Sequence, residues 1–168
     1  MRFGLKRFAA LGELHYGRKE TQPPGPQIKQ FYDQARDELK HPLLTLDDED
    51  IKVVANSFAK VIEECRYTCY ACAIMPDHVH VLIRKHREQA EAMIESLQEV
   101  TRDSLIAAGK RASSHPVWGG DGWKVFPYTQ ADFVRVIEYI RQNPIKAKRP
   151  TQHWSFVKKY DGWMPGYF

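Results

Sequence analysis

Residues 74–83 of this 168-residue chain read Ile-Met-Pro-Asp-His-Val-His-Val-Leu-Ile. Valine, leucine and isoleucine dominate the second half of the stretch, which is typical of a β-strand. Side chains alternate between the two faces of a strand, so His78 and His80 are expected to point the same way. Two imidazoles placed like this can share one divalent metal ion. A pair that is merely hydrogen-bonded is the alternative, because a metal site also needs a third ligand and open positions.

The sequence around this stretch predicts an antiparallel hairpin among helices. The hairpin strands are expected over 67–75 and 78–85, with a tight turn at Pro76-Asp77. The helical spacing of apolar residues predicts helices over 27–40, from Asp47 or Asp48 to Cys65, over 88–108 and over 132–142. Short strands are expected over 12–17 and 123–128, a glycine-rich loop over 115–122 and an irregular segment over 145–168. One domain accounts for all of these elements.

The last predicted helix carries Tyr139 and, one turn later, Asn143. The apolar face of this helix consists of Phe133, Val136, Ile137 and Ile140. At about 100° per residue, Tyr139 falls on the flank of that face, where its hydroxyl can face a cavity. Packing of the ring inside the core is the plain alternative. Asn143 shares the flank, and its amide oxygen can complete a metal site.

A histidine pair on a strand and a tyrosine on a helix together suggest phosphodiester chemistry with a tyrosine nucleophile. A phenol has a reference pKa of about 10, so such a nucleophile needs help near neutral pH. A divalent metal on the scissile phosphate would offset the negative charge that develops there. A phosphotyrosine bond keeps most of the energy of the bond it replaces, so a DNA hydroxyl can attack it and reseal the strand.

Composition indicates an ordinary globular chain, with 43% hydrophobic and 27% charged residues. No apolar run approaches the roughly 18 residues of a membrane span, and the N-terminus lacks the apolar stretch of a secretory signal. We therefore expect a cytoplasmic protein. The three cysteines, Cys65, Cys69 and Cys72, are expected to be reduced thiols. A zinc site is the alternative, but it needs a fourth ligand, and Cys69 and Cys72 fall on opposite faces of the predicted strand.

The excess positive charge lies in the last third of the chain. Residues 106–168 hold ten lysines and arginines against four acidic residues, whereas residues 1–50 and 51–105 each carry one net negative charge. A polyanion bound near that end would explain the asymmetry, although a solvated surface is the simpler reading. Candidate DNA-binding residues are Lys110, Arg111, Trp118, Trp123, Lys124, Lys146, Lys148 and Arg149. At least two of the four tryptophans are expected to pack inside.

Two stretches resemble a known family. Residues 75–83 resemble the HUH motif (histidine, hydrophobe, histidine) of single-tyrosine HUH transposases. Residues 139–147, Tyr-Ile-Arg-Gln-Asn-Pro-Ile-Lys-Ala, are similar to the signature of the REP-associated tyrosine transposases. The loop from His115 through Trp118 to Trp123 also resembles the tryptophan-bearing loop of that branch. The resemblance covers roughly residues 43–163.

This resemblance implies a ferredoxin-like α+β fold, with helices packed on an antiparallel sheet that carries the histidines. It implies metal-dependent cleavage and strand transfer on single-stranded DNA near imperfect palindromic hairpins. Tyr139 would form a 5′-phosphotyrosine and release a 3′-hydroxyl, with His78, His80 and Asn143 as ligands of Mg²⁺ or Mn²⁺. The protein would be a nucleoid-associated monomer or homodimer.

The N-terminal region departs from the family pattern. The family normally opens with a strand inside the sheet, whereas residues 1–25 have no clear strand pattern and 26–42 resemble a helical insertion. A domesticated protein that binds hairpin DNA without cutting it is therefore the main rival. A metal hydrolase of small phosphoesters is a third reading, but it leaves Tyr139 and the basic last third unexplained.

Overall fold

The predicted hairpin lies at the centre of the fold. In this computed structural model, β3 (Cys69–Ile74) pairs antiparallel with β4 (Val79–Ile83) across the connection 75–78. The backbone amide of Met75 donates to the carbonyl of His78 at 2.8 Å and closes the turn. The predicted strands are thus confirmed, with slightly narrower limits than the sequence suggested.

The structure describes residues 44–119 and 122–166, together with 7–8, 12–13, 26, 30 and 33–34. A separate two-stranded pair, β1 (Arg7–Phe8) with β2 (Gly12–Glu13), accounts for the start of the strand predicted over 12–17. Gln30, Asp33 and Gln34 are helical, in agreement with the helix predicted over 27–40. The rest of both predictions lies outside the described residues.

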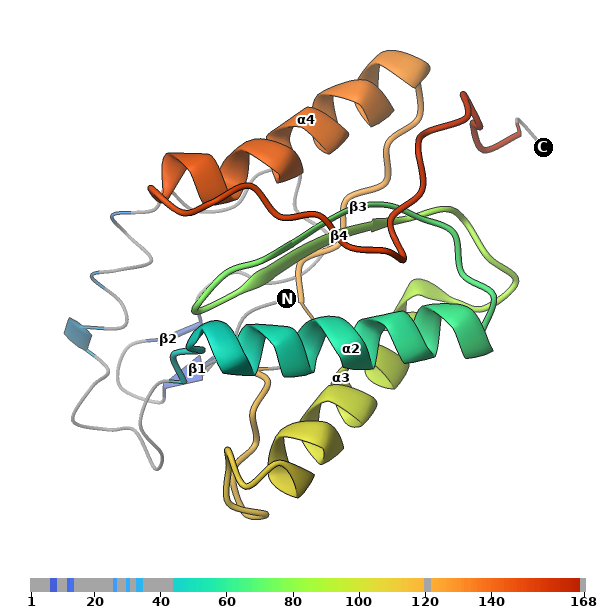
Figure 1. Ribbon diagram of the computed structural model, residues 1–168. Coiled ribbons are helices and arrows are strands. Elements are labelled where there is room, and N and C mark those ends of the chain that lie inside the picture. Colours follow the sequence, from blue (N-terminus) through green and yellow to red (C-terminus); the bar gives the residue numbers. More distant parts are fainter. Residues whose placement is uncertain are drawn as a thin grey trace.

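Helices cover both faces of the hairpin, as Figure 1 shows. On one face lie α2 (Asp48–Glu64) and α3 (Ala90–Ala107), and on the other lies α4 (Gln130–Lys146). The antiparallel sheet with helices packed on it confirms the predicted α+β class. Among the helices of the described part, none has both the length and the apolar character needed to cross a membrane.

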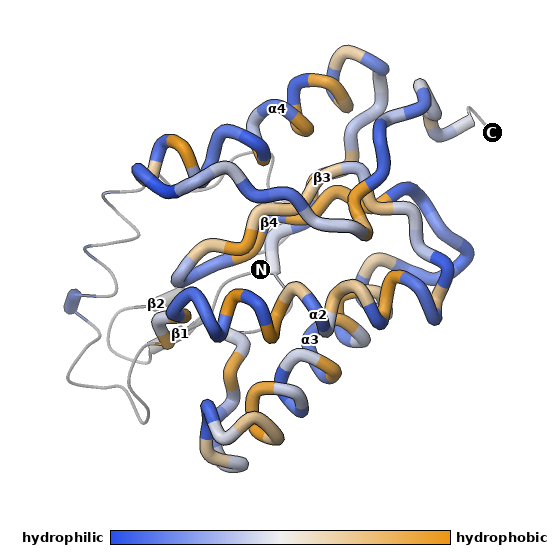
Figure 2. The backbone as a smooth tube through the Cα atoms, viewed as in Figure 1, coloured by the Kyte–Doolittle hydropathy of each residue, from blue (hydrophilic) through white to orange (hydrophobic). Residues whose placement is uncertain are grey.

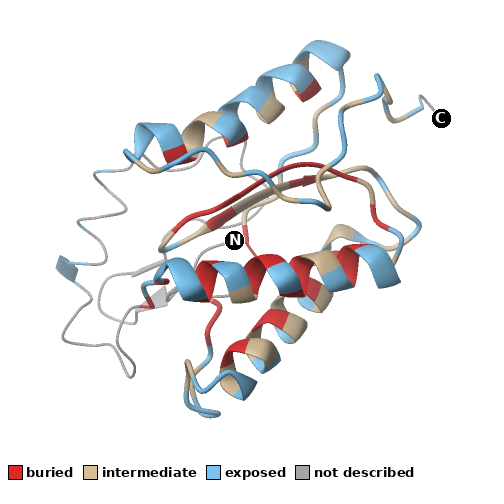
Figure 3. Cartoon of the chain, viewed as in Figure 1, coloured by how far each residue is buried: buried red, intermediate tan, exposed pale blue. Residues whose placement is uncertain are grey.

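The hairpin separates two apolar cores, and hydrophobic residues are concentrated along its strands (Figure 2). We call the cluster between the hairpin and α2 and α3 the large core; its fully buried members include Val54, Phe58, Ile74, Val79, Leu97 and Leu105. The small core lies under α4 and consists of Tyr70, Ala71, Ala73, Leu82, Phe133 and Ile140. Figure 3 shows the consequence: β3 is buried throughout, whereas the outer side of α4 is exposed.

Capping boxes fix the starts of two helices. Asp47 caps α2 by accepting from the Asp50 amide at 2.7 Å, and the Asp50 carboxylate accepts from the Asp47 amide at 3.3 Å. Thr129 and Asp132 form the same motif at the start of α4. Asp47 is therefore the cap, one of the two residues the sequence offered.

The end predicted for the last helix is wrong. We expected Asn143-Pro144 to stop it, but α4 continues through Pro144 to Lys146. A proline inside a helix removes one hydrogen bond, and in the last turn few further bonds depend on it. The turn after Pro144 is kept by the amide of Ala147, which donates to the Asn143 carbonyl at 3.1 Å.

A β-bulge at Tyr70 overturns the expectation that Cys69 and Cys72 lie on opposite faces. The register shifts between Cys69 and Ala71, so Cys69 pairs with Ile83 and Cys72 with Val81. Because the bulge inserts one extra residue, both thiols enter the large core. Both are free, and burial raises the pKa of Cys69 to about 12 and that of Cys72 well above its ordinary value.

The strand predicted over 123–128 is also wrong. These residues form an extended lead-in to α4 with no strand pairing among the described residues. Val125 and Phe126 are each 58% exposed, so the stretch does not pack on the sheet as its β-rich composition suggested. Pro127 also lacks the amide that a strand ladder requires.

The irregular tail runs along the edge of β3 that faces away from β4. Val157 forms an isolated bridge with Cys69, and the amide of Lys158 donates to the Cys69 carbonyl at 2.8 Å. At the other end of β3, the Gln152 side chain accepts from the Ile74 amide at 2.8 Å and donates to the Ile74 carbonyl at 2.7 Å. The tail thereby satisfies backbone groups that an edge strand would otherwise expose.

Candidate active site

Three aromatic rings meet between the hairpin and α4. His80 lies in β4 and His78 directly precedes that strand. Their ring centroids are 4.8 Å apart at an interplanar angle of 84°, so the two imidazoles share one face, as predicted. The ring of Tyr139 contacts His80 edge-on, at 5.4 Å between centroids. The structure thus brings together the two motifs that the sequence singled out.

Strand alternation explains why this face carries the histidines. Val79 belongs to the large core, and Val81 and Ile83 pack against it. Leu82 belongs to the small core under α4. His80, between Val79 and Val81, therefore points to the same side as Leu82, toward α4.

Tyr139 lies on the flank of α4, as the helical spacing predicted. Phe133, Ile140 and Pro144 are the buried residues of this helix, whereas Tyr139 remains 50% exposed. The alternative that its ring packs in the core is therefore wrong. One side of the ring contacts His80, and the Lys146 ammonium lies 5.6 Å from the ring centroid. Solvent, and hence a ligand, can therefore reach the Tyr139 side chain that carries the hydroxyl group.

Asn143 follows Tyr139 by one helical turn, about 6 Å along the axis. Its side-chain amide nitrogen donates to the backbone carbonyl of Tyr139 at 2.7 Å. This bond uses the nitrogen and leaves the amide oxygen as the chemically suitable atom for a cation. The sequence predicted the turn spacing but not the bond.

His78 contacts Asp77, a residue that the sequence did not single out. His78 Nδ1 lies 2.6 Å from Asp77 Oδ1. A carboxylate only accepts hydrogen bonds, so Nδ1 is the donor in this contact and Nε2 is the ring nitrogen that the contact leaves unused. The only available signal was that an acidic residue directly precedes His78.

The side chains of His78, His80 and Asn143 carry nitrogen and oxygen donors of the kind that bind divalent cations. Across the described residues, no group of three or more histidine, cysteine, aspartate or glutamate side chains is arranged to hold a metal. A cation held here would therefore depend on the two imidazoles, on oxygen donors such as the Asn143 amide and on solvent. Such a mixed nitrogen and oxygen set suits Mn²⁺ better than a site built of thiolates would.

Four of the candidate DNA-binding cations are engaged with carboxylates. Arg111 and Lys110 lie 2.9 and 3.9 Å from the two oxygens of the buried Asp50. Lys124 lies 3.1 Å from Glu91 on α3, and Arg149 pairs with Asp48 at the start of α2. These pairs join segments far apart in the chain, and sequence spacing contains no signal for them.

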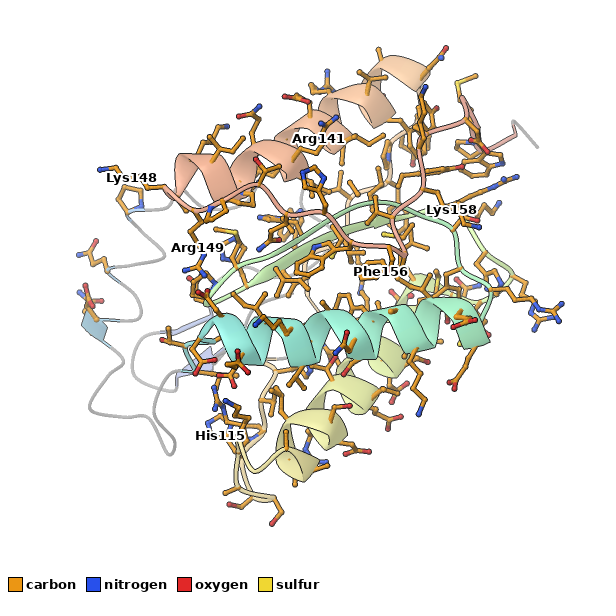
Figure 4. All side chains as sticks on the ribbon, in the orientation of Figure 1. His115, Arg141, Lys148, Arg149, Phe156 and Lys158 are labelled. Carbon is orange, nitrogen blue, oxygen red and sulfur yellow. The ribbon has the colours of Figure 1, made fainter. Side chains whose placement is uncertain are left out.

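Lys146 and Lys148, at and just after the end of α4, are the candidate DNA-binding cations that form no ion pair within the described part of the chain. Lys146 lies over the Tyr139 ring. Figure 4 shows Lys148 extending away from the end of α4, whereas Arg149 turns toward the start of α2. These two lysines are the cations at this end of α4 that remain available for a phosphate.

The tryptophans are mostly structural. Trp118 is buried, and its indole nitrogen donates to the Gln98 carbonyl at 2.9 Å. Trp154 packs against the large core and Trp163 against the small core, which confirms that at least two of the four lie inside. Trp123 is half-buried in the lead-in to α4. Base stacking by Trp118 or Trp123 stays a prediction.

Comparison with known proteins assigns the chain to a family. A family model described as "Transposase IS200 like" matches residues 40–143, more than half of the chain. The matched range contains the hairpin, both histidines, Tyr139 and Asn143. No curated protein and no solved structure matches the chain. The chain therefore belongs to the family of IS200-like transposases, whose members are DNA-cleaving enzymes.

Proposed function

We propose that this protein cuts and rejoins single-stranded DNA near hairpins, using Tyr139 as the nucleophile, as in the REP-associated tyrosine transposases. The observation that supports this most is the ring contact between His80 and Tyr139, at 5.4 Å between centroids. Family membership supports DNA as the substrate, and the ring contact supports Tyr139 and His80 as residues of the reaction.

In the proposed reaction, Tyr139 Oη attacks the scissile phosphorus. A new bond forms between phosphorus and Oη, and the bond between phosphorus and the 3′-oxygen breaks. The phenolic proton leaves to solvent, and the departing 3′-oxygen takes up a proton to become a 3′-hydroxyl. Attack by a 3′-hydroxyl on the phosphotyrosine reverses these changes and joins strands without an external energy source.

His78, His80 and Asn143 would hold a Mg²⁺ or Mn²⁺ ion. When bound, the ion would offset negative charge on the scissile phosphate. The contact between Asp77 and His78 supports this assignment, because a ligating histidine commonly donates its other ring N–H to a carboxylate. Mg²⁺ prefers oxygen ligands, so Mn²⁺ should serve a two-imidazole site well.

Lys146 and Lys148 would neutralise phosphates of the bound strand. Lys146 lies over the ring of the nucleophile, and both side chains are exposed and free of ion pairs within the described residues. A cation at this position adds to the electrostatic stabilisation of the attacked phosphate. Hairpin DNA presents such phosphates next to unpaired bases.

The test is formation of a covalent adduct with a library of hairpin-forming oligonucleotides in Mn²⁺, resolved on a denaturing gel. The wild-type protein should yield an adduct, and Tyr139→Phe should yield none while still binding the DNA. Tyr128→Phe is the matched control, because Tyr128 is an exposed tyrosine in the lead-in to the same helix. An adduct that persists in Tyr139→Phe or maps to Tyr128 would contradict the assignment. Hairpin binding without any adduct would favour the non-cutting rival.

A further inference from the structure

We propose that Asp77 is a positioning residue that sets the ring orientation and tautomer of His78, so that Nε2 faces the metal position. The inference rests on the proposed function and deepens it, because it assigns a role outside the set of metal ligands. It starts from the 2.6 Å contact between Asp77 Oδ1 and His78 Nδ1.

The contact determines which ring nitrogen can bind a cation. A neutral imidazole in water prefers the proton on Nε2, which would block the nitrogen that faces outward. With the carboxylate of Asp77 as acceptor, Nδ1 carries the proton, so the neutral ring has its lone pair on Nε2. The His78 side chain is only 18% exposed and lies edge-on to His80, so the ring has little freedom to turn otherwise.

The backbone holds Asp77 in place for this role. The Met75 amide bonds to the His78 carbonyl at 2.8 Å, and the Leu46 amide donates to the Pro76 carbonyl at 2.7 Å. In Figure 1 this closed end of the hairpin lies beside the start of α2, on the same side of the molecule as the end of α4. Because these bonds fix the backbone on both sides of Asp77, its carboxylate starts from a fixed point next to the imidazole.

A second explanation is that Asp77 acts through its charge alone. It is 61% exposed, and a carboxylate near a cation attracts it whatever the ring orientation. The two explanations differ for Asp77→Asn, which removes the charge but keeps an oxygen that accepts from Nδ1. Positioning predicts that this variant resembles the wild type more than Asp77→Ala does. Attraction by charge alone predicts that both variants are equally weak.

The experiment measures Mn²⁺ binding by electron paramagnetic resonance and the His78 tautomer by nitrogen NMR of metal-free protein. Asp77→Ala should weaken Mn²⁺ binding by about 10-fold to 100-fold, the usual cost of losing such a partner, and should move the ring toward the Nε2–H tautomer. Asp77→Asn should show a smaller loss and keep the Nδ1–H tautomer. Asp103→Ala removes an exposed carboxylate elsewhere and should change neither quantity.

Unchanged Mn²⁺ affinity in Asp77→Ala would overturn the proposal, and so would equal losses in the alanine and asparagine variants. Thermal unfolding of each variant separates these results from loss of the fold. Mn²⁺ binding by the variant His78→Ala separates a failure of this proposal from a failure of the proposed function. If it binds Mn²⁺ like the wild type, the metal site itself is refuted, and the tautomer spectra still decide whether Asp77 sets the ring.

Discussion

The two faces of the β3–β4 hairpin differ in what they bury. The face toward α2 and α3 is closed by aliphatic and aromatic side chains of the large core, with Phe58 fully buried at its centre. The face toward α4 has a smaller core and, beside it, two histidines and a half-exposed tyrosine. One sheet thus supplies rigidity on one side and reactive groups on the other, and each side can be perturbed separately.

The largest expected effect is on cleavage, from His78→Ala on the α4 face. Loss of one of two imidazoles should abolish metal-dependent cleavage while hairpin binding and the free energy of unfolding change little. Denaturing gels report the cleavage, and urea unfolding reports the stability.

His86→Ala is the matched control for this prediction. The side chains of His78 and His86 are 18% and 19% exposed, but His86 lies beyond the other end of β4, edge-on to Tyr67. It should lower stability slightly and leave cleavage intact. Equal loss of cleavage in both variants would show that the hairpin fold, and not the site, had been damaged.

The next effect is on stability and compares two buried phenylalanines. Phe58→Ala in the large core should cost about 3–5 kcal/mol, the usual range for this substitution in a core. Phe133→Ala in the small core should cost less, because the partly buried Tyr160 and Trp163 beside it can move into the space. Urea unfolding of both variants measures the difference. A larger loss for Phe133→Ala would reverse our ranking of the two faces.

The features that sequence alone predicted are those with a local period. The twofold period of a strand placed both histidines on one face, and the 3.6-residue period of a helix placed Tyr139 on the flank of α4. The cap of α2 also followed from local residues, because Asp47 and Asp50 form a capping box three residues apart. Such features depend on neighbours within one turn or one strand.

The features that sequence could not predict depend on distant contacts. The bulge at Tyr70 accompanies packing of that side chain under α4, where its hydroxyl donates to Asp161 at 2.8 Å. The pairing of Arg111 with Asp50 joins the segment after α3 to the first turn of α2. The bulge places Cys69 and Cys72 on one face, against the prediction of opposite faces. The ion pair engages Arg111, which the sequence offered as a DNA-binding residue.

The bulge leads to a prediction of pH dependence for the large core. Burial raises the pKa of Cys69 from 9.0 to about 12, so the unfolded chain loses this proton at a lower pH than the folded chain does. The contribution of the Cys69 thiol to the free energy of unfolding is therefore fully present below pH 9 and is lost as the pH rises toward 12. Within that window, stability should fall by up to about 1.4 kcal/mol per pH unit for this thiol.

Cys69→Ala tests this dependence. The variant should be less stable at neutral pH, because a buried side chain is truncated, but its stability should fall less steeply above pH 9. Urea unfolding of both proteins at several pH values, with reductant present, measures the two slopes. Identical slopes would show that this thiol does not titrate differently in the two states.

The smallest expected effect concerns DNA binding at the end of α4. Lys148 is exposed, and within the described residues it forms no ion pair, so Lys148→Gln should remove one phosphate contact. The slope of log affinity against log salt should then decrease by roughly 0.7–0.9.

Lys60→Gln, which changes an exposed lysine on α2, should leave the slope unchanged. Arg149→Gln should change it less than Lys148→Gln does, because Asp48 already pairs with that guanidinium. Equal slopes for the Lys148 and Lys60 variants would mean that DNA does not approach the end of α4, which would separate the histidine face from the surface that binds the strand.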